Sequence, residues 1–258
     1  MSWPFDTSAP LVTPAQNSEY MRLQAGMSEI EWALPPTLVA TFQRAAWERL
    51  TGRCGIASET GLGPGHTPLC GQVDGVRVAA ARLMVGAPAT ALTMEIAIAR
   101  GVRNVVVVGA AGSLRDDLPV GSAVVISTAE REDGTSHHYL PAGEVVEADQ
   151  RLSDLLVAHA TERGARPIRG RSWTIDAPYR ETAAAIRRHR HAGVSVVEME
   201  AAAMFAVARV RGIRAGLIVS ISDEVGHAEW RPGFDHERYR STLLAASDAV
   251  LDCAVELR

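Results

Sequence analysis

The segment VSVVEMEAAAMFAVARVRG, residues 194–212, joins a run of β-branched residues to an alanine-rich run with helical spacing. Two carboxylates, Glu198 and Glu200, lie at the junction. If the extended backbone of 194–198 continues to Glu200, this spacing places both carboxylates on one side and Met199 on the other. Carboxylates that converge at a strand end can bind ligand hydroxyls. The alternative is that Glu200 caps the helix at its positive N-terminus and Glu198 faces water.

Apolar runs of two kinds alternate along the chain. Runs rich in valine and isoleucine alternate with alanine- and leucine-rich runs of helical spacing. This alternation is typical of a sheet covered by helices, so we predict a three-layer α/β sandwich with a central mixed β-sheet. The predicted strands are 76–85, 104–112, 121–128, 166–174, 194–198 and 214–222, and the predicted helices are 36–50, 89–100, 149–163, 200–211 and a last one from 236.

The chain of 258 residues contains no Pro/Gly/Ser-rich linker that would divide it into domains. We therefore predict one domain over residues 1–258. Residues 1–35 are rich in Pro, Ser and Thr, and we expect them to form an irregular lead-in to that domain.

The composition argues against several classes of protein. A net charge of −4 provides no cationic excess for a nucleic-acid backbone. Three cysteines without CxxC spacing indicate neither a disulfide framework nor a zinc site. The sequence contains no signal-peptide pattern and no run of about 18 apolar residues. We expect a cytoplasmic protein with a small-molecule ligand, no metal, and no membrane or nucleic-acid partner. All 26 basic residues are arginines, which is typical of a high-GC bacterial genome.

The run VVVVGAAGSL, residues 105–114, is a predicted buried strand that enters a glycine turn. The backbone N–H groups of Gly109, Ala110 and Gly112 could approach an anion or a sugar there. The glycines could equally serve only to turn the chain. The GxGxxG fingerprint is absent, so dinucleotide binding and an oxidoreductase are not favoured.

Asp223 directly follows the apolar run 214–222. Partial desolvation of a carboxyl at that position would raise its pKa and let it hold a proton to donate. The alternative is that Ser222 or Asp223 caps a following turn by accepting backbone hydrogens.

Two other segments carry side chains with possible chemistry. Tyr179, in WTIDAPYRET, could stack on a planar base or serve only in packing. The adjacent His137 and His138 are poor joint ligands for one metal, so we expect them to face solvent. GxSxG, HExxH, P-loop and EF-hand patterns are absent from the sequence.

Six segments in this order resemble the nucleoside phosphorylase and nucleosidase superfamily, in the branch of purine nucleoside phosphorylases, uridine phosphorylases and methylthioadenosine nucleosidases. The resemblance covers residues 76–226, and VEMEAA followed by a strand ending in SD is its most specific part. The segments are GAPATALTMEIAIARG, VVVVGAAGSLRDDLPVGSAVVI, EDGTSHHY, DAPYRET, VVEMEAAAMFAVARVRG and SDEV.

The resemblance implies roles for individual residues. It implies that Glu200 binds ribose hydroxyls, that Met199 packs on the sugar, and that Glu198 lies beside base and sugar. Asp223 matches an aspartate that protonates a purine base at N7. Tyr179 lies where the family places an aromatic ring against the base. Carboxylates beside an anomeric carbon that becomes cationic would stabilise the transition state more than the substrate.

The departures from the family pattern concern the phosphate site. Phosphorylases of this branch carry an arginine and a hydroxyl in the turn where this chain has Val107 and Ala110. Their early phosphate motif is not visible either, and the segment 61–71 offers His66 but no arginine. Binding a dianion without charged donors is weak. Arginines elsewhere could rebuild the site, and the candidates are Arg82, Arg115, Arg180 or one from a neighbouring subunit.

We therefore predict an enzyme that cleaves the N-glycosidic bond of a purine-type nucleoside, by hydrolysis more than by phosphorolysis, without a cofactor unless phosphate is a co-substrate. The alternatives are a phosphorylase with a rebuilt phosphate site and an inactive nucleoside-binding protein.

The resemblance also implies a homo-oligomer (dimer, trimer or hexamer). Gly109 to Gly112 would bring backbone to the nucleophile, Ser222 would lie beside the substrate, and Trp230, Arg231 and Phe234 are candidates for a lid.

Overall fold

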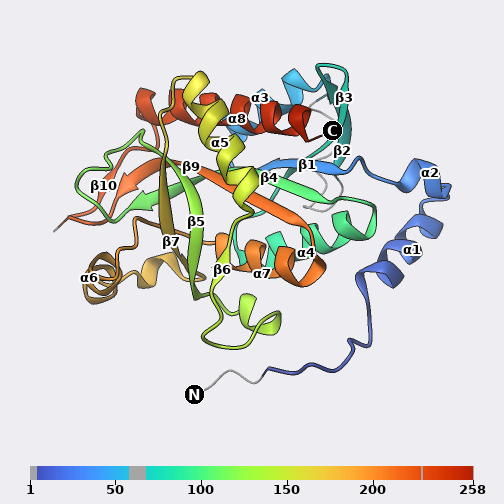
Figure 1. Ribbon diagram of the computed structural model, residues 1–258, viewed down its shortest axis with the longest axis horizontal. Coiled ribbons are helices and arrows are strands. Elements are labelled where there is room, and N and C mark those ends of the chain that lie inside the picture. Colours follow the sequence, from blue (N-terminus) through green and yellow to red (C-terminus); the bar gives the residue numbers. More distant parts are fainter. Residues whose placement is uncertain (1–4, 58–67, 228, 258) are drawn as a thin grey trace.

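The computed structural model describes residues 5–57, 68–227 and 229–257. Its strands form one mixed sheet in the order β10–β9–β5–β7–β8–β4–β1–β3–β2, with β6 paired to β5 (Figure 1). The strands are β1 (Thr37–Thr41), β2 (Leu69–Val73), β3 (Val76–Arg82), β4 (Asn104–Ser113), β5 (Ala123–Glu132), β6 (Val146–Glu147), β7 (Ile168–Ile175), β8 (Val196–Glu198), β9 (Arg214–Glu224) and β10 (Arg231–Pro232).

The sheet closes on itself at one end. β9 pairs with β5 on one side and with β4 on the other, so β9, β5, β7, β8 and β4 form a ring of paired strands. β4 is buried on both faces between β1 and β9, to which it runs parallel, and this explains its continuous valine run. The ring brings the ends of β4, β8 and β9 together.

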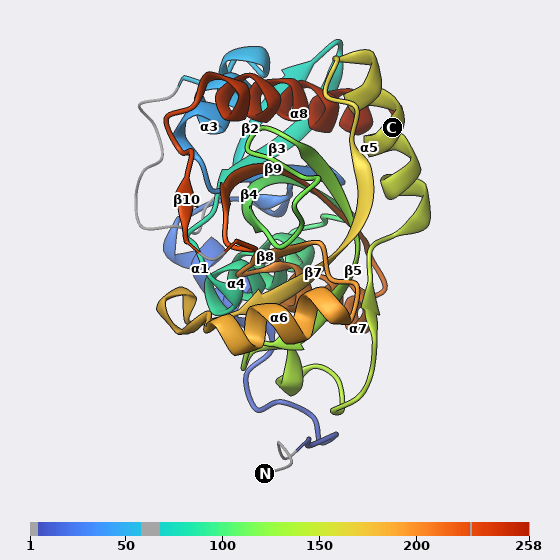
Figure 2. The ribbon, with the colours of Figure 1, turned by 90° about the vertical axis from the view of Figure 1, so that its left-hand side faces the viewer.

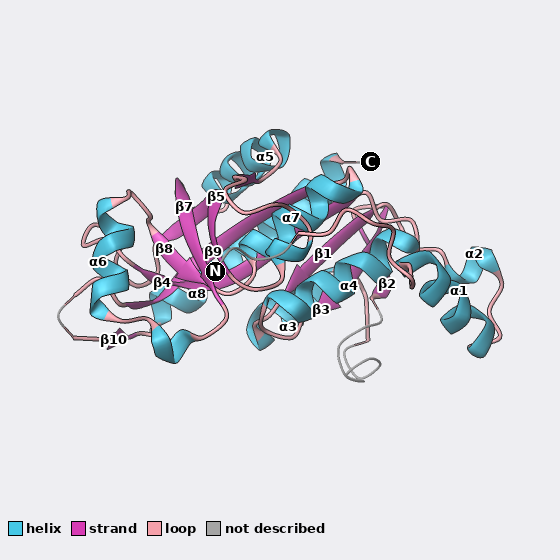
Figure 3. Cartoon of the chain, turned by 90° about the horizontal axis from the view of Figure 1, so that it is seen from below, coloured by secondary structure: helices cyan, strands magenta, loops and turns pink. Residues whose placement is uncertain are grey.

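Helices cover both faces of the sheet, which confirms the predicted α/β class with a central mixed sheet (Figures 1 and 3). One layer holds α3 (Arg44–Arg53), α5 (Gln150–Glu162) and α8 (Glu237–Glu256); the other holds α4 (Ala87–Ala99) and α7 (Ala201–Arg211), with α1 (Pro14–Gln24) against α4. The remaining helical segments are α2 (Glu29–Trp32), η1 (Ser136–His138), η2 (Pro178–Arg180) and α6 (Ala183–His191).

Two expectations about the N-terminal third were wrong. Residues 37–41, expected within a helix, form the fully buried strand β1, because TLVAT is paired on both sides by β3 and β4. The lead-in 1–35 is not irregular throughout. Thr13 and Gln16 form a reciprocal capping box at the start of α1, and Ser28 and Glu31 do the same for α2.

Trp32 anchors this N-terminal segment to the body of the protein. Its indole N–H donates to Ser18 Oγ at 2.8 Å, and the Arg100 guanidinium lies 4.0 Å from its ring centroid. In the part of the chain that the structure describes, no helix is long and apolar enough to cross a membrane.

Candidate active site

A cavity of about 1340 Å³ is lined by residues at or just after the ends of β1, β4, β8 and β9 and by residues of η2 and α6. Figure 2 views the protein from the side on which α6 and β10 lie. It brings together residues far apart in the chain, which include all but one of the predicted catalytic and substrate-binding residues. Those that line it are Ala110, Gly112, Tyr179, Glu198, Met199, Glu200, Ser222 and Asp223. Phe42 and Gln43, directly after β1, also line it.

Glu198 has both carboxylate oxygens occupied by the protein. One oxygen accepts from the Thr174 hydroxyl, and the other accepts the backbone N–H groups of Glu200 at 2.8 Å and Ala201 at 2.6 Å. These two N–H groups belong to the start of α7, so Glu198 occupies the positive end of that helix. Burial raises the pKa of Glu198, and the hydrogen bonds act against that shift. Glu198, not Glu200, therefore satisfies the helix terminus.

Glu200 is hydrogen-bonded to the start of α4. Its Oε1 accepts the backbone N–H of Gly86 at 2.6 Å. Gly86 has φ of +110°, a conformation that residues with a Cβ rarely adopt, and this directs its N–H to the carboxylate. Burial, and then the charge of Glu198, raises the pKa of Glu200 to about 8. Glu200 is thus a nearly buried carboxyl facing the cavity beside Met199.

Asp223 lies near the end of β9 and accepts two side-chain hydrogen bonds. The Ser222 hydroxyl donates to Oδ1 at 2.7 Å, and the Trp230 indole N–H donates to Oδ2 at 2.8 Å. A register shift between Ala111 and Gly112 interrupts the pairing of β4 with β9 at this level. A Cβ at Gly112 would lie 3.4 Å from Asp223 Oδ2, so glycine leaves room at the carboxylate.

Glu181 is a site residue that the sequence did not reveal. It lines the cavity between η2 and α6, and burial together with the charge of Asp223 raises its pKa to about 7. In the sequence, Glu181 precedes the Thr182 N-cap of α6 and resembles an ordinary acid near a helix start. The two residues lie far apart in the sequence, and only the fold places Glu181 near enough to Asp223 for that charge to act on its pKa.

Three exposed aromatic side chains surround the cavity mouth. Tyr179 is 100% exposed, Trp230 61% and Phe234 56%. The Trp230 and Phe234 rings lie 6.3 Å apart and are tilted by 55°. Arg231, the third residue expected in a lid, lies outside the cavity lining and approaches Glu224 at 3.6 Å.

Gly109 differs from the expectation, because it does not line the cavity. A Cβ at this position would contact Val219, Leu217 and Phe42 at 3.6 to 3.7 Å, so this side of Gly109 faces the core. Ala110 and Gly112, one and three residues further on, do reach the cavity.

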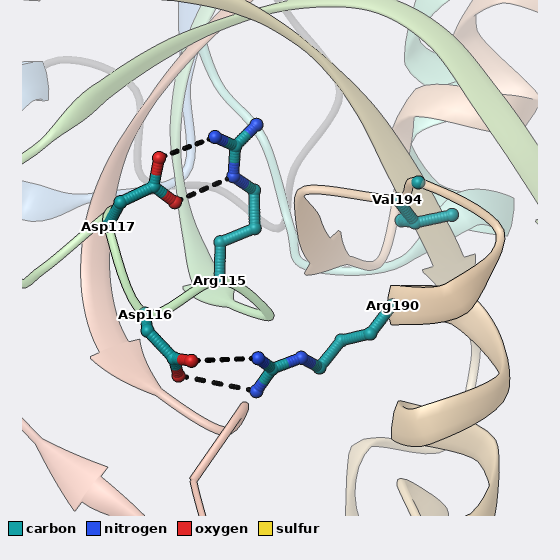
Figure 4. A pocket seen from close by; sticks show the side chains of 6 residues that line it. Arg115, Asp116, Asp117, Arg190 and Val194 are labelled. Atoms are coloured by element: carbon teal, nitrogen blue, oxygen red, sulfur yellow. Dashed lines mark hydrogen bonds and ion pairs between the residues drawn. The ribbon is translucent and has the colours of Figure 1, made fainter.

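The three arginines suggested for a rebuilt phosphate site, Arg82, Arg115 and Arg180, are not among the described residues that line the cavity. Arg115 forms a two-pronged ion pair with Asp117, next to an equivalent pair of Arg190 with Asp116, in a separate pocket of about 490 Å³ (Figure 4). Arg180 lies outside the lining, as does Arg82. His66 lies outside the described residues.

The adjacent histidines also lie away from the cavity. The His137 ring nitrogens lie 3.3 Å from the Arg131 guanidinium and from the Arg131 backbone oxygen. Across the described ranges 5–57, 68–227 and 229–257, no group of three or more His, Cys, Asp or Glu side chains is arranged to hold a metal ion.

Comparisons with known proteins point to one family. Residues 53–253 match the family model described as "Phosphorylase superfamily". A guanosine phosphorylase from Halorubrum lacusprofundi is 31% identical over 148 residues, which are 57% of this chain and 61% of that protein. A DeoD-type purine nucleoside phosphorylase from Clostridium perfringens is 26% identical over 189 residues, covering 72% of this chain and 79% of its own. The chain thus matches about three fifths of the length of the first relative.

A solved structure has the same fold. The crystal structure of purine nucleoside phosphorylase from Toxoplasma gondii in complex with immucillin-H matches with a TM-score of 0.75 at 18% identity, over 87% of this chain and 92% of that one.

Proposed function

Because this chain belongs to the phosphorylase superfamily, we propose that it is an enzyme that cleaves the N-glycosidic bond of a purine-type nucleoside in the cavity at the ends of β4, β8 and β9. One observation carries the proposal: the same cavity holds the buried carboxyl of Glu200 and, on other elements, the carboxyls of Asp223 and Glu181. Cleavage of the glycosidic bond needs one protein group at the sugar and another at the base. The name of one relative, guanosine phosphorylase, supports a purine nucleoside as the substrate.

Glu200 acts on the sugar in this proposal. With a pKa of about 8, its carboxyl holds a proton at neutral pH in the empty cavity. Ribose hydroxyls that donate to it favour the ionised form and lower that pKa. A carboxylate formed in this way stabilises the positive charge that develops on the sugar as the bond breaks. Glu198 contributes indirectly, because it orients the backbone of Glu200.

Asp223 and Glu181 act on the base. A purine departs more easily when a proton is delivered to its ring nitrogen, and a positioned carboxylic acid can supply that proton. Burial, and then the charge of Asp223, raises the pKa of Glu181 to about 7, so Glu181 keeps a proton at this end of the cavity near neutral pH. Trp230 holds Asp223 in position through its indole N–H.

We assign water as the nucleophile. Val107 and Ala110 supply neither an arginine nor a hydroxyl to hold phosphate. Among the described residues that line the cavity, the cationic or potentially cationic side chains lie on α6 and the loop after β9: Arg187, Arg190, His191 and His227. The residues directly after β1 that line the cavity are Phe42 and Gln43, which carry no charge.

Phosphorolysis is the second candidate, and the names of the relatives favour it. A neighbouring subunit would then supply the cation that binds phosphate. The exposed apolar side chains of Met84, Val85 and Leu92, at or near the start of α4, support a homo-oligomer assembled over this region. Light scattering coupled to size-exclusion chromatography measures the subunit number.

The test is release of free base from a panel of purine and pyrimidine nucleosides, with and without phosphate. Release of purine that ignores phosphate, with free ribose as co-product, is the expected result. Release that requires phosphate and yields ribose 1-phosphate would show that phosphate, not water, is the nucleophile. The roles of Glu200, Asp223 and Glu181 would be unaffected. The Glu200→Gln variant is the control for contaminating activity. Absence of release from every nucleoside would overturn the proposed enzyme in favour of a nucleoside-binding protein.

A further inference from the structure

The helix α6 carries five consecutive basic residues, Arg187 to His191, and the structure separates them into two groups. Three are neutralised by acids or buried. Arg188 pairs with Glu132 at 2.6 Å and Arg190 with Asp116 at 2.9 Å. His189 lies 3.3 Å from Glu132 and stacks on the Trp173 ring, with centroids 4.2 Å apart.

Arg187 and His191 form the second group. Both line the cavity, and neither side chain forms a hydrogen bond or an ion pair with any residue in the described part of the chain. Their spacing of four residues places them on one face of α6, one turn apart. The cavity wall formed by α6 therefore presents two unpaired basic side chains to whatever occupies the cavity.

The position of α6 relates this wall to the base end of the site. Glu181 directly precedes the N-cap of α6 and lines the same cavity as Asp223. Further along α6, the Arg190 guanidinium donates to the backbone oxygen of Gly226, three residues after Asp223. With a rise of about 1.5 Å per residue, Arg187 and His191 lie roughly 6 and 12 Å beyond the first residue of α6. An anion bound by Arg187 and His191 is thus separated from the carboxyls of Glu181 and Asp223.

The cavity is also larger than a nucleoside requires. Its volume is about 1340 Å³, whereas pockets for drug-sized ligands typically measure roughly 300–1,000 Å³. A guanidinium binds carboxylate or phosphate through two parallel hydrogen bonds, and a neighbouring histidine adds a donor. The volume leaves room for an anionic group next to the base.

We infer that the substrate is a nucleoside whose base carries an anionic substituent, a carboxylate or a phosphate, and that Arg187 and His191 bind this substituent. The inference rests on the proposed function for the reaction and adds the class of substrate. It explains why two basic side chains at the cavity have no acidic partner among the residues that the structure describes.

The experiment compares three ligands: adenosine, adenosine with a succinyl group on N6, and adenosine 5′-phosphate. The wild type, Arg187→Gln, His191→Gln and the double variant are assayed for kcat/KM at low ionic strength. The control is Arg151→Gln, which removes the same charge from an exposed position on α5, outside the cavity lining. Dissociation constants are measured in parallel from the fluorescence of Trp230, which lines the cavity.

The N6-succinyl compound should exceed adenosine in kcat/KM by tenfold or more in the wild type and in Arg151→Gln. That ratio should fall about tenfold in Arg187→Gln, the typical effect of losing a hydrogen bond to a charged group, and further in the double variant. Added salt should also lower the wild-type ratio of kcat/KM between the succinyl compound and adenosine, because it screens the charge interaction.

Equal kcat/KM for the succinyl compound and adenosine, or a ratio that Arg187→Gln leaves unchanged, would overturn the inference. A preference for adenosine 5′-phosphate would show that the anionic group is on the sugar, and it would overturn the inference that this group is on the base. If no compound is cleaved, the proposed function fails; tight binding of the succinyl compound that requires Arg187 would still support the anion site.

Discussion

At the residue scale, the site depends on carboxyls that look alike in the sequence but have different partners in the fold. Glu198 is held by Thr174 and the start of α7, Glu200 by the N–H of Gly86, and Asp223 by Ser222 and Trp230. These partners decide which carboxyl oxygens remain available to a ligand.

Replacing Asp223 by Asn removes the group assigned as proton donor and keeps a similar shape. We expect kcat to fall by about 10²–10⁴-fold, the usual contribution of general acid catalysis. The dissociation constant of the nucleoside should change only a few-fold. Steady-state kinetics and Trp230 fluorescence measure the two quantities. Asp235→Asn, at an exposed carboxyl further along the chain, is the control and should retain kcat. Unchanged turnover in Asp223→Asn would remove the acid assignment.

Glu181 determines the pH dependence in our account. Its pKa is raised to about 7, so it keeps its proton below that pH and loses it above. Loss of this proton leaves Glu181 negatively charged and removes a proton from the base end of the cavity, so kcat/KM should decline as the pH rises through about 7. Glu181→Gln cannot titrate, so this decline should be absent from its pH profile. Glu229→Gln, at an exposed glutamate, should keep the wild-type profile. A decline at the same pH in Glu181→Gln would exclude Glu181 as its source.

At the element scale, Glu198 links β8, β7 and α7. Its carboxylate is the acceptor for two N–H groups of α7 and for the Thr174 hydroxyl on β7, and the Ala202 N–H donates in turn to that hydroxyl. The start of α7 is therefore held by one buried side chain, and the backbone at Glu200 is held with it.

Glu198→Ala should lower the free energy of unfolding by about 3 kcal/mol, because buried donors lose their acceptor. Urea denaturation measures this change from the midpoint and slope. Glu147→Ala, at an exposed glutamate in β6, should stay within about 0.5 kcal/mol of the wild type. If Glu198→Ala is as stable as the wild type but inactive, Glu198 contacts the substrate and does not serve mainly as a cap.

At the scale of the whole molecule, the empty cavity concentrates carboxyls whose pKa values are raised. Glu181, Glu198 and Glu200 all titrate above the usual glutamate range, chiefly because of burial. The folded protein therefore keeps protons that the unfolded chain releases. Stability from these groups is present below pH 4.5 and is lost as the pH rises through their folded-state pKa values, to about 8 for Glu200.

We therefore expect the free energy of unfolding of the wild type to decline between pH 5 and pH 8.5. The double variant Glu181→Gln/Glu200→Gln should decline less, by on the order of 2 kcal/mol over that range. Urea denaturation at a series of pH values tests this. Parallel curves for the two proteins would show that the cavity carboxyls titrate normally.

The local pattern was sufficient to predict most elements and part of the site. The predicted strands 104–112 and 214–222 became β4 and β9, and the residues Glu198, Met199 and Glu200 of VEMEAA lie at the cavity. Local patterns were insufficient where pairing with distant strands decides the outcome. TLVAT has apolar spacing compatible with a helix, yet β3 and β4 make it a strand.

The sequence by itself determined the α/β class, the family motifs and the residue types at the site, because hydrophobic periodicity and motif spacing are local properties of the chain. The tertiary structure alone decided which glutamate caps α7, why Glu181 feels the charge of Asp223, and why Gly109 turns to the core. It also decided which basic residues of α6 have no acidic partner among the described residues. Each of these depends on contacts between segments far apart in the chain, and the closure of β9 onto both β4 and β5 is what brings those segments together.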